Sequence, residues 1–300
     1  MVIDSPFLSV MSSLSDLLRV AARETSPHIL PECSLHIQQI AREHPAISEL
    51  LLSQAQSRAS YLMPQLFLEL GYSAVVGSNM DAAQRSATAP FAMLCLSCGI
   101  ADDLIDSANG GFTDRMGLGC MALAIAAAAW SIVAQDSDCT RRTLLGEVLS
   151  AFVADGINTA YREMQYAKTI SFSLDAYLEV SSHKAAVYTE HSLLIAHAIS
   201  GAAAPLRHTL SDLGRSTGLA LQMLDDLLDV DADGREAPDA PLTYALFLRS
   251  TGQPLSAAYD LIDETIERSK RIADSLPHPT RLIGLLDNLQ SFLHYYGTFA

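Results

Sequence analysis

Positive charge is scarce in this chain of 300 residues. It contains 19 Lys and Arg against 34 Asp and Glu, which gives a formal net charge of −15 at pH 7. Nucleic-acid phosphates and anionic membrane surfaces both favour basic protein faces, so this balance argues against nucleic acid and against a polybasic membrane contact. An acidic protein can still bind a phosphorylated substrate if metal ions lie between the two.

Cysteine is also sparse, and the five cysteines, at positions 33, 95, 98, 120 and 139, form no disulfide framework. Cys95 and Cys98 are spaced as C-x-x-C, but no second pair completes a zinc site and both lie in an apolar run. We therefore predict small buried thiols in a reducing compartment. The first residues lack the basic segment of a signal peptide, so the expected location is cytoplasmic.

Alternation of apolar and polar residues with a period of two, which half-buried strands require, is missing from the chain. Apolar residues instead recur at helical spacing and make up 49% of the sequence, enough for a substantial core. No Gly/Ser linker divides the chain, so we expect an all-α protein with a single domain over residues 1–300. The predicted helices span 11–24, 30–43, 46–74, 84–107, 116–135, 141–167, 174–201, 205–230, 241–251, 255–275 and 279–297.

Two features test the helical prediction. Residues 116–134, MGLGCMALAIAAAAWSIVA, carry no charge and approach the length of a membrane span. Their many Ala and Gly residues make the run only weakly lipophilic, so we expect a fully buried helix of a protein that is not integral to a membrane. Pro90 falls inside the predicted helix 84–107 and should kink or restart it.

Two acidic motifs stand out because the residues around them are apolar. DDLID begins at position 102, and DDLLD begins at position 225. Unpaired charge away from water is unfavourable by several kcal/mol per ion, so a positive partner is expected at each motif. In D-D-x-x-D the first and last residues lie one helical turn apart on one face, where their carboxylates can reach one cation.

Magnesium is the cation that suits this arrangement. It takes oxygen ligands, keeps several waters and commonly bridges carboxylates to substrate phosphates. Two such motifs facing each other across a bundle could hold a metal cluster with a diphosphate between them. We expect these aspartates to be the metal ligands and catalytic residues: Asp102, Asp103, Asp106, Asp225, Asp226 and Asp229.

At this point the sequence resembles a known family, the trans-isoprenyl diphosphate synthases or polyprenyl synthetases of the class I terpene synthase superfamily. FSLDAYLEVSSHKAAVY at 172–188 is similar to the family's Tyr…Lys-Thr-Ala segment, with Tyr177 and Lys184 in place. GLALQMLDDLLDV, which begins at 218, is similar to the family's G-x-x-F-Q-x-x-D-D-x-x-D-V, and LTYALFL at 242–248 to its Lys-x-Thr-Tyr-Pro segment.

The resemblance implies an antiparallel helical bundle around a deep apolar cavity. It implies three magnesium ions that bridge the two motifs to an allylic isoprenyl diphosphate, with Lys184 and Gln222 as contacts to the diphosphate. A homodimer is expected from the resemblance alone.

The chain departs from the family where a second diphosphate would bind. The family's early G-G-K-R-x-R-P appears as RASYLMP at 58–64, and its paired arginines after the first motif fall on Gly111 and Phe112. The lysine before Thr-Tyr is Pro241, and the Gly-Gln-x-x-Asp segment is GINTA from 156. A diphosphate without compensating cations is not held, because charge-assisted contacts carry such sites.

This pattern favours a terpene synthase, a cyclase that ionises one allylic diphosphate and needs no isopentenyl diphosphate. The alternative is a prenyl diphosphate synthase or prenyltransferase that adds the prenyl group to isopentenyl diphosphate or another acceptor. A non-catalytic partner subunit is a third hypothesis, against which the six retained aspartates count.

Small residues before the first motif, Ser97 and Cys98, predict by resemblance a deep cavity that suits substrates of fifteen carbons or more. Aromatic faces can stabilise a carbocation, although ordinary core packing explains aromatic residues equally well. The candidate cavity residues are Ser97, Cys98, Phe67, Phe91, Phe152, Tyr161 and Leu221.

Overall fold

The computed structural model describes residues 62–106, 112–166, 173–228, 254 and 256–297, together with the single positions 14, 17, 18, 20, 21, 38 and 42. Within these residues every regular element is a helix, which confirms the all-α prediction. The helices are α5 (Leu62–Val76), α6 (Ala82–Asp106), α7 (Phe112–Gln135), α8 (Cys139–Tyr166), α9 (Leu174–Ser200), α10 (Pro205–Leu228), α12 (Ser256–Ala273) and α13 (Thr280–Gly297).

Apolar periodicity located most of these helices closely. The predicted bounds for α6, α8, α9, α10, α12 and α13 agree with the observed ones within two residues, whereas α5 is described only from Leu62. The prediction for 241–251 lies outside the described residues, as do most positions of 11–24 and 30–43. α6 continues through Pro90 as one helix, so the predicted restart does not occur. Buried residues on both sides of Pro90 hold this helix in the bundle.

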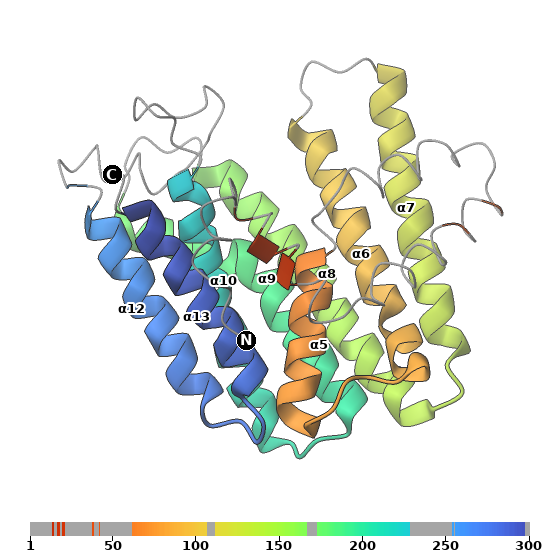
Figure 1. Ribbon diagram of the computed structural model, residues 1–300. Coiled ribbons are helices and arrows are strands. Elements are labelled where there is room, and N and C mark those ends of the chain that lie inside the picture. Colours follow the sequence, from red (N-terminus) through yellow and green to blue (C-terminus); the bar gives the residue numbers. More distant parts are fainter. Residues whose placement is uncertain are drawn as a thin grey trace.

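Helix α9 is the centre of the bundle. It packs against α10, α5 and α8, while α6 pairs with α7, and α12 contacts both α10 and α13. In Figure 1, α12 and α13 cover one side and α6 and α7 stand on the other. One apolar cluster is formed by residues of α5, α9, α10, α12 and α13. A second cluster is formed by residues of α5, α6, α7, α8 and α9. α9 therefore contributes to both halves of the core.

Two glycines allow α9 and α10 to approach closely. A Cβ atom at Gly214 would lie 2.4 Å from the Cα of Glu190, and one at Gly218 would lie 2.5 Å from the Cα of Ala186. The hydroxyl of Thr189 donates a hydrogen bond of 2.6 Å to the carbonyl of Gly214 across the same contact. Backbone packed this tightly fixes the register of α9 on α10, and with it the side chains that the two helices bring together.

Helix α7 is less buried than predicted. Met121, Ile125 and Ala129 pack into the core, but Met116 is 53% exposed and Leu123 is 74% exposed. Residues Met116–Gln135, with a mean hydropathy of 2.0, are long and apolar enough to cross a membrane, and 28% of the most apolar window is buried. Length and composition alone are weak evidence for a span. The prediction of full burial was wrong because a helix that is uncharged all round does not reveal which face it buries.

Candidate functional site

The start of α9 carries the tyrosine and lysine of the family-like segment. Ser173 caps the helix, and its side chain accepts a hydrogen bond of 3.1 Å from the backbone N–H of Ala176. Tyr177 and Lys184 are seven residues, or two turns, apart and so lie on the same face of the helix. Tyr177 is completely buried, whereas Lys184 is half-buried.

The end of α10 brings the second acidic motif to this face. Asp226 is 6% exposed, and each of its carboxylate oxygens accepts one hydrogen bond. The hydroxyl of Tyr177 donates to Oδ2 at 2.5 Å, and Nε2 of Gln222 donates to Oδ1 at 2.7 Å. The adjacent Asp225 is exposed, because neighbouring residues of a helix point about 100° apart. The two aspartates therefore have different surroundings.

Burial raises the pKa of Asp226 to about 6, although several groups act in the opposite direction. The hydrogen bonds from Tyr177 and Gln222 and the positive charge of Lys184 favour the ionised carboxylate, and the charge of Asp225 disfavours it. Lys184 is therefore close enough to Asp226 to act on its charge. Near neutral pH this site contains a buried carboxylate whose ionised form is held by a phenol, an amide and a nearby ammonium group.

The first acidic motif lies at the same end of the bundle. α6 ends at Asp106, and Figure 1 shows the C-terminal ends of α6 and α10 at the same end of the molecule. The side chains of Asp102, Asp103 and Asp106, and the whole of Asp229, lie outside the described residues. Their predicted role as metal ligands stays a prediction.

No group of three or more His, Cys, Asp or Glu side chains that could hold a metal ion occurs in the part of the chain that the structure describes. The donor type nevertheless fits magnesium, since exposed Asp225 offers carboxylate oxygens next to a lysine-bearing face. The diphosphate contacts predicted for Lys184 and Gln222 also stay predictions, and the amide of Gln222 is bound to Asp226.

The candidate cavity residues that are buried lie in two different core clusters. Phe67 and Leu221 belong to the core cluster that contains α10, whereas Phe91 and Phe152 belong to the other cluster and contact each other at 5.1 Å between ring centroids. Tyr161 is 59% exposed. Helical spacing alone could not separate these faces.

The two small residues before the first motif also differ. The hydroxyl of Ser97 donates a hydrogen bond of 2.8 Å to the carbonyl of Ala122, so this side chain lies in the contact between α6 and α7. Cys98 is partly buried against the cluster of α6, α7 and α8. Cys95 is buried, and the described cysteines are free thiols, which agrees with the prediction of no disulfide framework.

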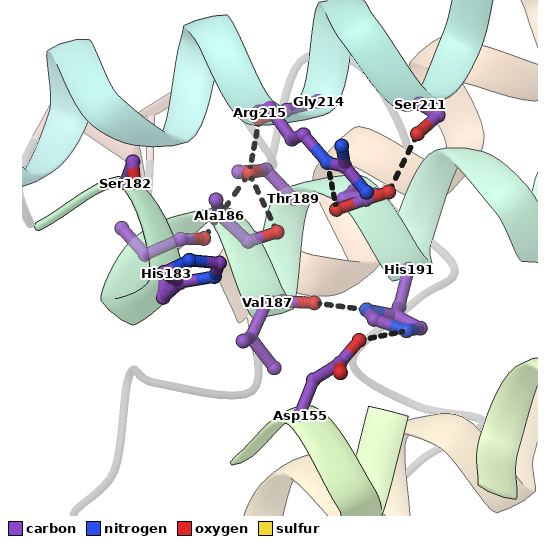
Figure 2. Close-up of polar contacts among 12 residues, drawn as sticks. Asp155, Ser182, His183, Ala186, Val187, Thr189, His191, Ser211, Gly214 and Arg215 are labelled. Atoms are coloured by element: carbon purple, nitrogen blue, oxygen red, sulfur yellow. Dashed lines mark hydrogen bonds and ion pairs between the residues drawn. The ribbon is translucent and has the colours of Figure 1, made fainter. Parts of the chain in front are cut away.

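A second polar cluster lies further along α9 (Figure 2). Glu190 accepts hydrogen bonds from Ser211 at 2.5 Å and from Arg215 at 2.8 Å, both on α10. On the other side, Nδ1 of buried His191 lies 2.8 Å from the carbonyl of Val187, and its Nε2 lies 3.5 Å from Asp155 of α8. Burial lowers the pKa of His191 below its ordinary value. These contacts tie α9 to α8 and α10.

Sequence reasoning missed one contact of the candidate site, the hydrogen bond between Tyr177 and Asp226. Tyr177 was noted only as part of a motif, and no role followed from it. The signal that could have found the contact is the pairing of two motifs on consecutive antiparallel helices. A tyrosine near the start of the first helix then meets an aspartate near the end of the second.

Comparisons with known proteins agree with this geometry. Residues 119–238, which contain α8, α9 and α10, match the polyprenyl synthetase family model. A decaprenyl-diphosphate synthase of Dictyostelium discoideum is 22% identical over 260 residues, which cover 83% of this chain and 55% of that protein. The chain thus spans little more than half the length of this relative.

Solved structures share the fold. A decaprenyl diphosphate synthase from Rhodobacter capsulatus superposes with a TM-score of 0.73 at 18% identity, over 94% of this chain and 99% of that one. A geranyltransferase from Helicobacter pylori, complexed with magnesium and isoprenyl diphosphate, gives a TM-score of 0.62 at 18% identity, over 91% of this chain and 98% of that one. The chain therefore has the isoprenoid synthase fold.

Proposed function

We infer that this chain, a divergent relative of the polyprenyl synthetases, acts on an allylic isoprenyl diphosphate and transfers its prenyl group to isopentenyl diphosphate. The observation that carries this proposal is the junction of two helices inside the matched range. There the Tyr177–Lys184 face of α9 meets Asp225 and Asp226 of α10. Prenyl transfer to isopentenyl diphosphate, the alternative named in the sequence analysis, fits the comparisons better than cyclisation does.

Asp225 would hold magnesium at the C-terminal ends of α6 and α10. The aspartates whose side chains lie outside the described residues would complete the site: Asp102, Asp103, Asp106 and Asp229. Magnesium bound there would stabilise the negative charge that develops on the departing diphosphate. Lys184 would add a positive contact to the same leaving group. The apolar residues behind the site, including Leu221, would keep water away from the allylic cation.

A second candidate function is cyclisation of the allylic diphosphate without an acceptor. The sequence at 58–64 and at Gly111 and Phe112 lacks the cations that would hold isopentenyl diphosphate. On α8, Ile157 and Ala160 stand where the family has polar residues, and Ile157 is 65% exposed. An apolar surface of this kind suits a folded hydrocarbon better than a second diphosphate.

A test of the step shared by both candidate functions is release of inorganic diphosphate from farnesyl diphosphate in the presence of isopentenyl diphosphate, which serves as the acceptor if the prenyl group is transferred. We expect release with magnesium, none with EDTA, and a loss of at least tenfold in Lys184→Met. Arg268→Met, which removes an exposed cation of α12, is the matched control and should keep the parent rate. If Lys184→Met and the parent released diphosphate at equal rates, the proposed contact of Lys184 with the diphosphate would be wrong.

We also propose a homodimer in which a second copy covers the outward face of α7. The exposed residues of this face are uncharged and recur at spacings of three and four residues. In a two-fold dimer both copies would use this same face. Its exposed residues are Met116, Cys120, Leu123, Ala127, Ser131 and Ala134.

A further inference from the structure

His191 of α9 is a buried titratable group that the proposed reaction does not use. Its side chain is 2% exposed, and the ring of Phe152 on α8 packs against it with 5.6 Å between ring centroids. Nδ1 lies 2.8 Å from the carbonyl oxygen of Val187, and Nε2 lies 3.5 Å from a carboxylate oxygen of Asp155 on α8 (Figure 2). The two ring nitrogens therefore face α9 itself and α8.

These two contacts fix where the ring carries its hydrogen. A carbonyl oxygen only accepts, so Nδ1 of His191 carries a hydrogen in the neutral ring as well as in the charged ring. Nε2 of the neutral ring is then an acceptor, and it faces another acceptor, the carboxylate of Asp155. A hydrogen bond forms between them only when Nε2 gains a proton, and that bond is charge-assisted.

The surroundings of the ring oppose this charge in part. Burial is the largest influence and favours the neutral ring, whereas the carboxylates of Glu190 and Asp155 favour the charged ring and Arg215 of α10 disfavours it. Glu190 accepts hydrogen bonds from Ser211 and Arg215, so its charge is compensated on the side of α10. Asp155 is the carboxylate that faces Nε2.

The charged side chains described on α5 and α6, the other helices that contact α9, are directed elsewhere. Glu69 of α5 lies about 200° around its helix from Gly71, which faces α9. Arg85 of α6 donates a hydrogen bond to the carbonyl of Met80, which precedes that helix. The proton of His191 is therefore shared with α8.

We propose that His191 and Asp155 form a proton-binding site that ties α8 to α9 when the ring is charged. In the neutral protein two acceptors face each other and the tie is absent. In acid, Nε2 donates to Asp155, and this bond offsets part of the cost of the buried charge. His191 lies two turns beyond Lys184 on the same face of α9, so the tie acts on the helix that carries the proposed diphosphate contact.

The first test is the tautomer of His191 at pH 8, measured from the ¹⁵N chemical shifts of the ring nitrogens by NMR. His191→Gln assigns the signals. We expect a hydrogen on Nδ1 and none on Nε2. A hydrogen on Nε2 at pH 8 would mean that the ring already donates to Asp155 without a charge, and the proposal would be overturned.

The second test is the proton affinity of the same ring, followed by NMR between pH 8 and pH 4.5. Asp155 is 52% exposed, so its replacement should leave the core intact. Asp155→Ala removes the acceptor and should lower the proton affinity at least threefold. Asp155→Asn, whose Nδ2 can donate to Nε2 of the neutral ring, should lower it further. Glu147→Gln removes an exposed charge from α8 two turns away and is the matched control, which should titrate as the parent does.

Two results of the titration would contradict the tie. If Asp155→Ala and the parent titrated alike, Asp155 would not hold the proton. If the ring of the folded parent stayed neutral down to pH 4.5, the site would bind no proton. Neither result bears on the proposed function, because the proposed reaction does not use His191 or Asp155.

Discussion

Replacing Asp226 by asparagine should stabilise the metal-free protein at neutral and alkaline pH. Burial raises the pKa of this carboxyl from 3.8 to about 6 in the folded chain. Because one pKa unit corresponds to 1.36 kcal/mol, the ionised carboxylate lowers the free energy of unfolding by about 3 kcal/mol at pH 8 relative to strongly acidic pH. Asp226→Asn removes this loss and can keep both contacts, because the Tyr177 hydroxyl can donate to the new Oδ1 and Gln222 can turn its amide to accept from the new Nδ2.

The sign follows from the direction of the shift. An acid whose folded pKa is raised contributes stability below its unfolded pKa of 3.8 and loses it as pH rises through about 6. About 1.4 kcal/mol of the difference between variant and parent should therefore develop between pH 5 and pH 8. Urea unfolding in EDTA, followed by circular dichroism at several pH values, measures it. EDTA is needed because bound metal would itself stabilise the carboxylates.

Asp225→Asn is the matched control for this experiment. Asp225 is exposed and is the weakest influence on the Asp226 carboxyl, so its replacement should change the pH dependence of unfolding far less than Asp226→Asn does. If Asp226→Asn also ran parallel to the parent between pH 5 and pH 8, the carboxyl of Asp226 would not titrate with a raised pKa. The burial argument would then be refuted.

Three further predictions concern the packing of the bundle. Burial lowers the pKa of His191, so below about pH 6.5 the unfolded chain binds more protons at this group than the folded chain does. The parent should therefore lose stability as the pH falls from 7 to 5. His191→Gln should reduce this loss, as measured by urea unfolding at several pH values. Gly218→Ala should lower the free energy of unfolding by about 1–3 kcal/mol, because its Cβ would lie 2.5 Å from the Cα of Ala186; an unchanged urea midpoint would contradict the close approach of α9 and α10. Leu123→Glu should convert a dimer to a monomer in light scattering with an unchanged circular dichroism spectrum, and a parent that is already monomeric would refute the α7 contact.

Helix positions could be predicted from the sequence because they depend on local periodicity and on breakers such as the Gly201 turn after α9. Gly201 adopts a φ of 64°, a left-handed conformation that ends the helix. The same local signal could not show which way a helix faces when all its faces are apolar. For this reason the burial of α7 was overestimated, and the hydrogen bond from the Ser97 hydroxyl to the carbonyl of Ala122 on α7 was not foreseen.

The candidate site was predicted in outline but not in its contacts. The paired aspartates in an apolar helix indicated a polar site near the end of α10, and the resemblance of one segment to the family identified Tyr177 and Lys184 within α9. The hydrogen bond between Tyr177 and Asp226 joins residues 49 positions apart. It depends on the register that Gly214 and Gly218 set between two helices, and no pattern within either helix contains that register.

Product analysis tests the central claim most directly. The protein would be incubated with Mg²⁺ and farnesyl diphosphate, with and without isotopically labelled isopentenyl diphosphate, and both the aqueous and the organic phase would be analysed. The proposed prenyl transfer predicts longer, labelled prenyl diphosphates that form only when isopentenyl diphosphate is present. A hydrocarbon or alcohol formed from farnesyl diphosphate alone would contradict prenyl transfer and identify a cyclase.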